Sequence, residues 1–203
     1  ADEDIASVYL KGNTVTLNNV SSTPTCQTYT DWTALTPVDL SAGAKYTIVV
    51  TESTCNGHYT YACNAWIDYN KNNTFESSEA VSVTSQSKSG AGAVFTYSWT
   101  VPCNIVPGNT RMRVVLIEGS VSNPGSACGT YTWGETEDYT VSLQLPTSLS
   151  ASFIAPNQAW VKAVVKFING NQSGYISHQW DADNNGSIEA PNSVNFNYTW
   201  TTP

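Results

Sequence analysis

Apolar and polar residues alternate along most of the chain, a pattern typical of half-buried β-strands rather than helices. Amphipathic-helix spacing is not sustained anywhere, and Gly or Pro interrupts the chain roughly every 10–15 residues. Segments rich in β-branched and aromatic residues predict strands at 14–20, 44–51, 59–69, 93–101, 111–117, 139–145, 151–155, 161–168, 175–180 and 194–200. Short strands joined by Asn- and Gly-containing turns predict an all-β fold, an antiparallel and jelly-roll-like sandwich.

The composition changes at residues 145–150, where Pro146 stands among Ser and Thr between two predicted strands. Such a segment is typical of a short extended linker, so we expect two domains, residues 1–145 and residues 146–203. The second domain has about four predicted strands, and the sequence ends within a strand pattern at Pro203. We therefore expect it to be an incomplete sandwich with an unpaired edge strand.

Charge and composition exclude several classes of partner. The chain has 8 Lys and Arg residues against 16 Asp and Glu residues, which disfavours binding to nucleic acid and to anionic membranes. We expect no membrane insertion, since no apolar run approaches the roughly 20 residues that span a bilayer. Five cysteines in a polar, Thr-rich chain indicate an oxidising compartment, hence an extracellular or cell-surface location. They allow two disulfides in fifteen combinations, among which the sequence does not choose.

A loop of twelve residues beginning at Asp68 has the ligand spacing of a calcium site. Counted from Asp68, side-chain oxygens fall at positions 1, 3, 5, 9 and 12, and position 7 can contribute a carbonyl. Position 6, where such loops turn left-handed, is Asn73, a residue type that tolerates this conformation. The alternative interpretation is a solvated, Asn-rich hairpin turn. The expected calcium ligands are Asp68, Asn70, Asn72, Thr74, Glu76 and Glu79.

A second loop, residues 181–189, has oxygen-bearing side chains at positions 1, 3, 5, 7 and 9 and a glycine at position 6. Position 12 is Asn192 rather than a bidentate carboxylate, so we expect a modest affinity. The alternative is a plain Asx turn. Neither loop is flanked by predicted helices, so each would be a calcium staple on a β-hairpin rather than an EF-hand. The expected ligands are Asp181, Asp183, Asn185, Ser187 and Glu189.

Three carboxylates, Glu135, Glu137 and Asp138, lie next to a predicted strand and need partners. Arg111 and Arg113 share one face of another predicted strand. We expect a structural ladder of ion pairs between these arginines and the three acids. Contact of the acids with a metal ion or a ligand is the alternative.

Two pairs of aromatic residues are each spaced two residues apart: Tyr59 with Tyr61, and Tyr131 with Trp133. If exposed, such pairs would form a platform that stacks on sugar rings, whereas buried pairs would belong to the core. The two histidines, one in each expected domain, lie in no recognisable nucleophile–base motif, so we expect no catalysis.

Six short segments occur in a familiar order: 4–8 (DIASV), 29–33 (YTDWT), 43–50 (GAKYTIVV), 66–70 (WIDYN), 108–114 (GNTRMRV) and 134–139 (GETEDY). Together they resemble the secreted GEVED domain, with Thr136 in place of the family's usual Val. The family often opens with a Tyr-Cys pair that this chain lacks, which would account for the odd number of cysteines. The resemblance implies an extracellular accessory role and supplies no ligand.

Three later segments, 150–153 (SASF), 180–186 (WDADNNG) and 198–203 (YTWTTP), resemble a truncated PKD domain. That resemblance implies part of an immunoglobulin-like β-sandwich. Domains of both families occur in large bacterial surface and secreted proteins, beside proteases or within adhesins.

These observations predict a non-catalytic, calcium-stabilised structural or adhesive module of a bacterial extracellular or cell-surface protein. Its expected partners are other domains of the same protein or neighbouring subunits. One alternative is a carbohydrate-binding accessory module of a secreted enzyme, which exposed aromatic pairs on one face would favour. Another is a subunit of an extracellular filament whose open second domain is completed by a neighbour's strand.

Overall fold

The structure is a computed structural model, and almost all of its regular secondary structure is β-strand. None of the helices in the described residues is long and apolar enough to cross a membrane. The chain divides into two compact units, Ala1–Leu145 and Pro146–Pro203, which are described separately. The described residues are 2–21, 24, 26–82, 86–119, 126–146, 153–154, 162, 164–169, 179–183, 186–189 and 195–200.

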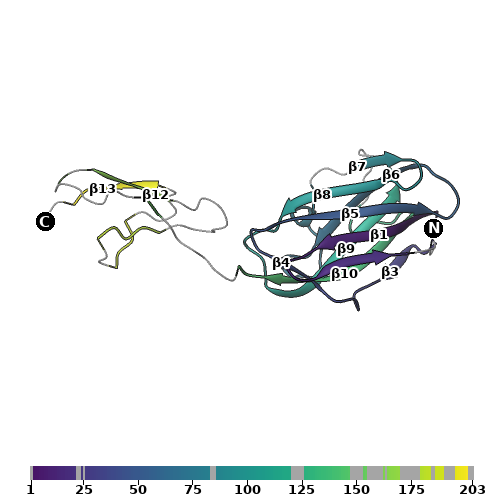
Figure 1. Cartoon of the computed structure of the whole chain (residues 1–203), viewed down its shortest axis with the longest axis horizontal. Coiled ribbons are helices and arrows are strands. Elements are labelled where there is room, and N and C mark those ends of the chain that lie inside the picture. Colours follow the sequence, from purple (N-terminus) through teal and green to yellow (C-terminus); the bar gives the residue numbers. More distant parts are fainter. Residues whose placement is uncertain are drawn as a thin grey trace. The chain divides into compact units, whose positions relative to one another are not determined.

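The first unit is a sandwich of two sheets (Figure 1). One sheet has the order β2-β1-β5-β8, formed by β1 (Glu3–Lys11), β2 (Thr16–Val20), β5 (Lys45–Thr54) and β8 (Val94–Thr100). The other has the order β3-β10-β9-β6-β7, with β4 also on β10; its strands are β3 (Tyr29–Asp31), β4 (Val38–Ser41), β6 (Thr60–Ile67), β7 (Gln86–Ser89), β9 (Gly108–Glu118) and β10 (Gly134–Gln144). The all-β prediction is confirmed. Pairing is antiparallel in both sheets except at β3 and β4, which lie parallel to β10.

Alternation along the strands places the core between the two sheets. In β5, Ile48 and Val50 are fully buried, and Phe95 and Tyr97 are the inward residues of the neighbouring β8. Burying side chains of this size contributes about 1.5–3 kcal/mol each. The inward series of β5 continues to Glu52, which is only 1% exposed. One end of the sandwich interior is therefore lined by carboxylates as well as by apolar groups.

One disulfide, between Cys26 and Cys55, joins the segment before β3 to the end of β5. The cysteine count allows two disulfides, but in the structure Cys63, Cys103 and Cys128 are free thiols. Burial raises the pKa of the Cys63 thiol, which makes it unreactive at neutral pH.

The described part of the second unit contains a small antiparallel sheet of order β11-β12-β13. Its strands are β11 (Phe153–Ile154), β12 (Val165–Asn169) and β13 (Asn195–Tyr198). Phe167 stacks on Phe196 with ring centroids 5.3 Å apart, and Trp180 lies 5.4 Å from Phe196. Most of the strand expected at 175–180 lies outside the described residues. The assignment of this unit to the PKD domain stays a prediction.

Candidate functional site

The acidic motif of residues 134–138 lies at the start of β10, where successive side chains point to opposite faces of the sheet. Asp138 lies opposite Arg113 of β9 on the outer face. Glu137 lies opposite Val114, whose side chain is fully buried in the core. The motif therefore supplies carboxylates to both faces of the same sheet.

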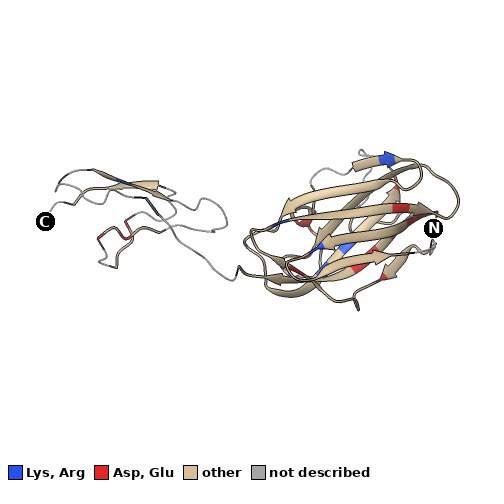
Figure 2. Ribbon diagram, in the orientation of Figure 1, with Lys and Arg blue, Asp and Glu red and all other residues tan. Residues whose placement is uncertain are grey.

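On the outer face, Arg113 binds Asp138 through two hydrogen bonds, from Nε to Oδ1 and from Nη2 to Oδ2, each 2.7 Å long. The third guanidinium nitrogen, Nη1, donates to the carbonyl oxygen of Ala127 at 2.9 Å. Tyr29 of β3 donates its hydroxyl proton to Asp138 at 3.0 Å. Arg111 makes a longer contact of 3.3 Å with Asp138, and its side chain is 51% exposed. Arg113 is thus the principal partner of Asp138, and Arg111 a peripheral one. Figure 2 shows basic positions, in blue, and acidic positions, in red, on neighbouring strands of the first unit.

The structure differs from the predicted ladder at Glu135 and Glu137, because both side chains point away from the arginines into the sandwich. Glu135 accepts hydrogen bonds from the backbone N–H of Ile5 at 2.8 Å and from the Thr30 hydroxyl at 2.7 Å. These contacts tie β1 and β3 to β10.

Glu137 is held by aromatic donors. Its carboxylate accepts hydrogen bonds from Trp32 Nε1 at 2.8 Å and from the Tyr139 hydroxyl at 2.6 Å. The Tyr139 hydroxyl in turn accepts a hydrogen bond from the Asn19 side chain of β2 at 3.0 Å. Burial raises the pKa of both Glu135 and Glu137 to about 7, and repulsion from nearby carboxylates acts in the same direction.

The backbone conformation at the first position of the motif requires a glycine. Gly134 has φ of +142°, and a Cβ there would lie 2.4 Å from the carbonyl oxygen of Leu116. Each acid that follows it ties a different neighbour to β10. The motif therefore acts as a clamp that holds strands from both sheets, which is a structural role.

The loop from Asp68 to Glu79 brings all six predicted ligand residues into one hydrogen-bonded network. Asp68 accepts from the backbone N–H groups of Asn72 at 3.1 Å and Asn73 at 3.0 Å. Asn73 has φ of +65°, the left-handed conformation expected at position 6. Glu79 reaches back to accept from the N–H of Tyr69 at 2.8 Å.

Glu76 lies on the exposed side of this loop. It accepts hydrogen bonds from the side chains of Asn70 at 3.2 Å, Asn72 at 2.6 Å and Thr74 at 2.7 Å. The bond from Asn72, followed by a contact with Glu79, lowers the pKa of Glu76 to about 2, whereas burial raises the pKa of Glu79. The loop is therefore preorganised by its own amides, with its oxygens gathered in one place.

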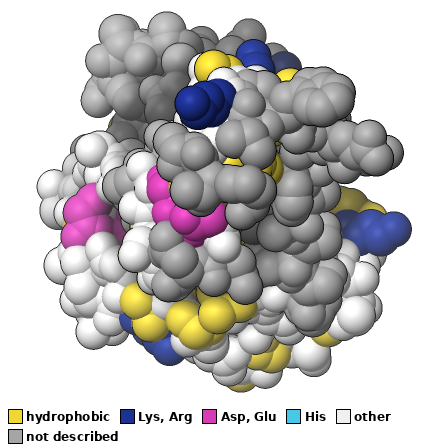
Figure 3. Space-filling view, turned by 90° about the vertical axis from the view of Figure 1, so that its left-hand side faces the viewer, with side chains coloured by type: hydrophobic (Ala, Val, Ile, Leu, Met, Phe, Trp, Pro, Cys, Tyr) yellow, Lys and Arg dark blue, Asp and Glu magenta, His cyan; other side chains and the backbone are white. Residues whose placement is uncertain are grey.

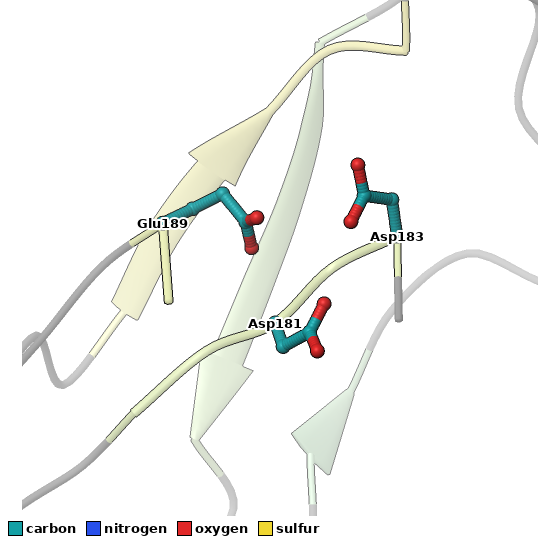
Figure 4. Close-up of side chains that lie close together, drawn as sticks. All are labelled: Asp181, Asp183 and Glu189. Atoms are coloured by element: carbon teal, nitrogen blue, oxygen red, sulfur yellow. The ribbon is translucent and has the colours of Figure 1, made fainter. Parts of the chain in front are cut away.

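In the second loop, Asp181, Asp183 and Glu189 turn their carboxylates toward a common space (Figure 4). One oxygen from each lies within 4.8 Å of the others, about twice a calcium–oxygen distance of 2.4 Å. Asp181 accepts from the N–H of Gly186 at 2.9 Å, and Gly186 has φ of +85°. Asn185 lies outside the described residues, and Ser187 lies in the described part of the loop.

The aromatic pairs do not form two-ring platforms. Tyr61 is fully buried, while Tyr59 is 44% exposed. Trp133 is 49% exposed, but Tyr131 is half-buried and packs against a small cluster of apolar side chains on the outer face of the second sheet. Tyr59, Tyr131 and Trp133 lie just outside β6 and β10, so the alternation along a strand does not determine which way these rings point.

Sequence reasoning missed a pocket of about 410 Å³ on the outer face of the second sheet. Lys71, Arg111 and Arg113 line it beside Asp68. Because Asp138 occupies Arg113, the cations available to an anionic group are Lys71 and Arg111. No sequence signal could have found this pocket, because its walls come from five separate parts of the chain that meet only in the fold.

Comparison with known proteins supports part of the sequence resemblance. Residues 62–142, less than half of the chain, match the family model of the GEVED domain. That range contains the loop from Asp68 to Glu79, both arginines and the acidic motif, and it confirms the resemblance there. A search of curated proteins finds no match.

Among solved structures, the chain is similar to the CARDB domain of the PF1109 protein from Pyrococcus furiosus, whose crystal structure is described as a complex with di-metal ions. The identity is 15%, the match covers 70% of this chain and 90% of that chain, and the TM-score is 0.34. A TM-score this low supports no inference about the present chain.

Proposed function

We propose that this chain is a calcium-stabilised, non-catalytic structural module of a bacterial extracellular or cell-surface protein. The observation that carries the proposal is the convergence of Asp181, Asp183 and Glu189 on one space at calcium-ligand spacing. Hard divalent cations collect oxygen ligands of this kind, and like charges placed so close together are stabilised by a cation between them.

The loop from Asp68 to Glu79 supports the same function independently. Its carboxylates and amide oxygens are held in place by backbone N–H groups, and the left-handed Asn73 makes the turn that such loops need. A bound ion would replace the hydrogen bonds between Glu76 and its amide neighbours with metal–oxygen bonds. Both loops are then staples on otherwise irregular backbone.

Several features support a structural role outside the cell. The carboxylates of the acidic motif form bonds that hold neighbouring strands together. The Cys26–Cys55 disulfide fits an oxidising compartment, and the GEVED match fits a secreted protein. In the view of Figure 3, the described Lys and Arg side chains form no basic stripe on either unit taken by itself. The partners we propose are other domains of the same protein or neighbouring subunits. Binding to them would make the chain a structural or adhesive module.

Calcium should raise the melting temperature of the full chain, and Asp68→Asn and Asp181→Asn should each remove part of that rise. An ion at a hundred times its dissociation constant stabilises the native state by about 2.7 kcal/mol at each site. Differential scanning calorimetry in calcium and in chelator measures the shift, and isothermal titration counts the sites. Asp31→Asn, the same charge change outside both loops, should leave the calcium response intact. Identical melting curves with calcium and with chelator would contradict the proposal.

A further inference from the structure

Two buried glutamates at one end of the sandwich lack the partners that buried charges require. Glu3 is fully buried, and neither of its carboxylate oxygens has a hydrogen-bond partner. Glu52 is 1% exposed; its Oε2 accepts from the N–H groups of Gly92 at 2.9 Å and Ala93 at 3.3 Å, while its Oε1 has no hydrogen-bond partner. In the described part of the chain, these three oxygens are the buried side-chain polar atoms without a partner.

The register of β1 and β5 places the two glutamates together. Ile5 lies opposite Glu52, and Glu3 lies two residues before Ile5 on the same inward face. Glu3 and Glu52 are therefore diagonal neighbours, within reach of one another across the strand pair. Burial raises the pKa of Glu3, and the negative charges of Glu118, Asp2 and Glu52 add to the effect.

The facing sheet closes the same end. Tyr61 of β6 lies opposite Glu118 of β9, so both side chains project toward the space between the sheets. Burial raises the pKa of Tyr61 to about 12, and contact with Glu52 and the charge of Glu3 act in the same direction. Glu118 is exposed, so it lies at the mouth of this space rather than within it.

The backbone around the two glutamates is held in place, and no basic residue neutralises their charges in the described part of the chain. A 2.8 Å hydrogen bond from the N–H of Cys55 to the carbonyl of Asp2 holds the ends of β1 and β5 together, and the Cys26–Cys55 disulfide joins the segment before β3 to the same end of β5. Among the described residues, no lysine or arginine forms an ion pair with Glu3 or Glu52. His58 lies 3.5 Å from Glu52 Oε1, but its side chain is 43% exposed and its charge depends on protonation.

We propose that this end of the sandwich is a third cation site, which binds a calcium ion through Glu3 and Glu52. The unpartnered oxygens are hard carboxylate ligands of the kind calcium prefers. Calcium takes six to eight oxygens, so water molecules complete the shell of an ion held by these two carboxylates. The site shares no residue with either loop, so this proposal can be tested independently of the two loops.

The test uses the full chain with both loops disabled by Asp68→Asn and Asp181→Asn. Isothermal titration with calcium chloride should find one remaining site, and calcium should still raise the melting temperature. Adding Glu52→Gln should abolish both signals. In chelator the same change should raise the melting temperature, because it removes a buried charge that no described lysine or arginine neutralises, while leaving an oxygen to accept from Gly92 and Ala93. Glu3→Gln provides a second variant with the same expectation.

Glu189→Gln in the same background is the matched control: it makes an equal charge change in a loop already disabled, and the remaining site should persist. Calcium binding that survives Glu52→Gln with Glu3→Gln would overturn the proposal, as would a background protein that binds no calcium. Zinc binding that replaces calcium binding and depends on His58 would overturn the choice of ion. Failure of the loop predictions leaves this result unaffected, because the loops are measured separately.

Discussion

Replacing Arg113 with alanine should lower the free energy of unfolding by about 3–5 kcal/mol, the cost of leaving a buried charge without its partner. Asp138 has a fully buried side chain, and the two 2.7 Å bonds from Arg113 are its main compensation. The change also removes the bond to the Ala127 carbonyl. Urea unfolding followed by tryptophan fluorescence measures the loss.

Arg111→Ala is the matched control, since it removes the same charge from the same strand face. Its contact with Asp138 is longer, at 3.3 Å, and half of its side chain is exposed. Ion pairs of that kind contribute about 0–1 kcal/mol, so the control should unfold nearly like the unsubstituted chain. Equal losses for the two variants would show that the bidentate geometry does not matter.

The arginine–aspartate pair illustrates what the sequence could predict. Arg111 and Arg113 were expected on one strand face, and the register of β9 and β10 puts both beside Asp138. The same two-residue period also requires Glu137 to point away from its neighbour Asp138. The error in the predicted ladder therefore came from treating three adjacent acids as one set, and the alternation itself could have corrected it.

Other features could not be predicted from local pattern. The parallel pairing of β3 and β4 with β10 joins segments about a hundred residues apart, and it brings Thr30 and Trp32 to the acidic motif. The burial of Glu3 and Glu52 depends on which strands lie opposite. Alternation along one strand does not show whether the facing strand contributes leucine or glutamate to the interior. The two loops, in contrast, are defined by short-range spacing, so the left-handed Asn73 could be anticipated.

Stability in chelator should fall as the pH rises from 5 to 8, and Glu137→Gln should make that fall smaller. Burial raises the pKa of Glu137 to about 7 in the folded chain, against an ordinary value of 4.5. Between these values the folded state holds a proton that the unfolded state has released, so the stability present at low pH is lost as the pH passes through about 7. At about 1.4 kcal/mol for each pKa unit, Glu137 accounts for about 3 kcal/mol of the fall in stability between pH 5 and 8.

Glutamine resembles the protonated acid: it stays neutral at every pH and can still accept the hydrogen bond from Trp32. Glu137→Gln should therefore unfold at a higher urea concentration than the unsubstituted chain at pH 8 and close to it at pH 5. Glu76→Gln is the control, because the pKa of Glu76 is held at about 2 and its charge does not change over this range. Urea midpoints at pH 5, 6, 7 and 8 in chelator measure both variants. A stability profile that is flat from pH 5 to 8, or one whose slope survives Glu137→Gln unchanged, would mean that Glu137 is ionised inside the sandwich, where Trp32 and Tyr139 alone would have to compensate its charge.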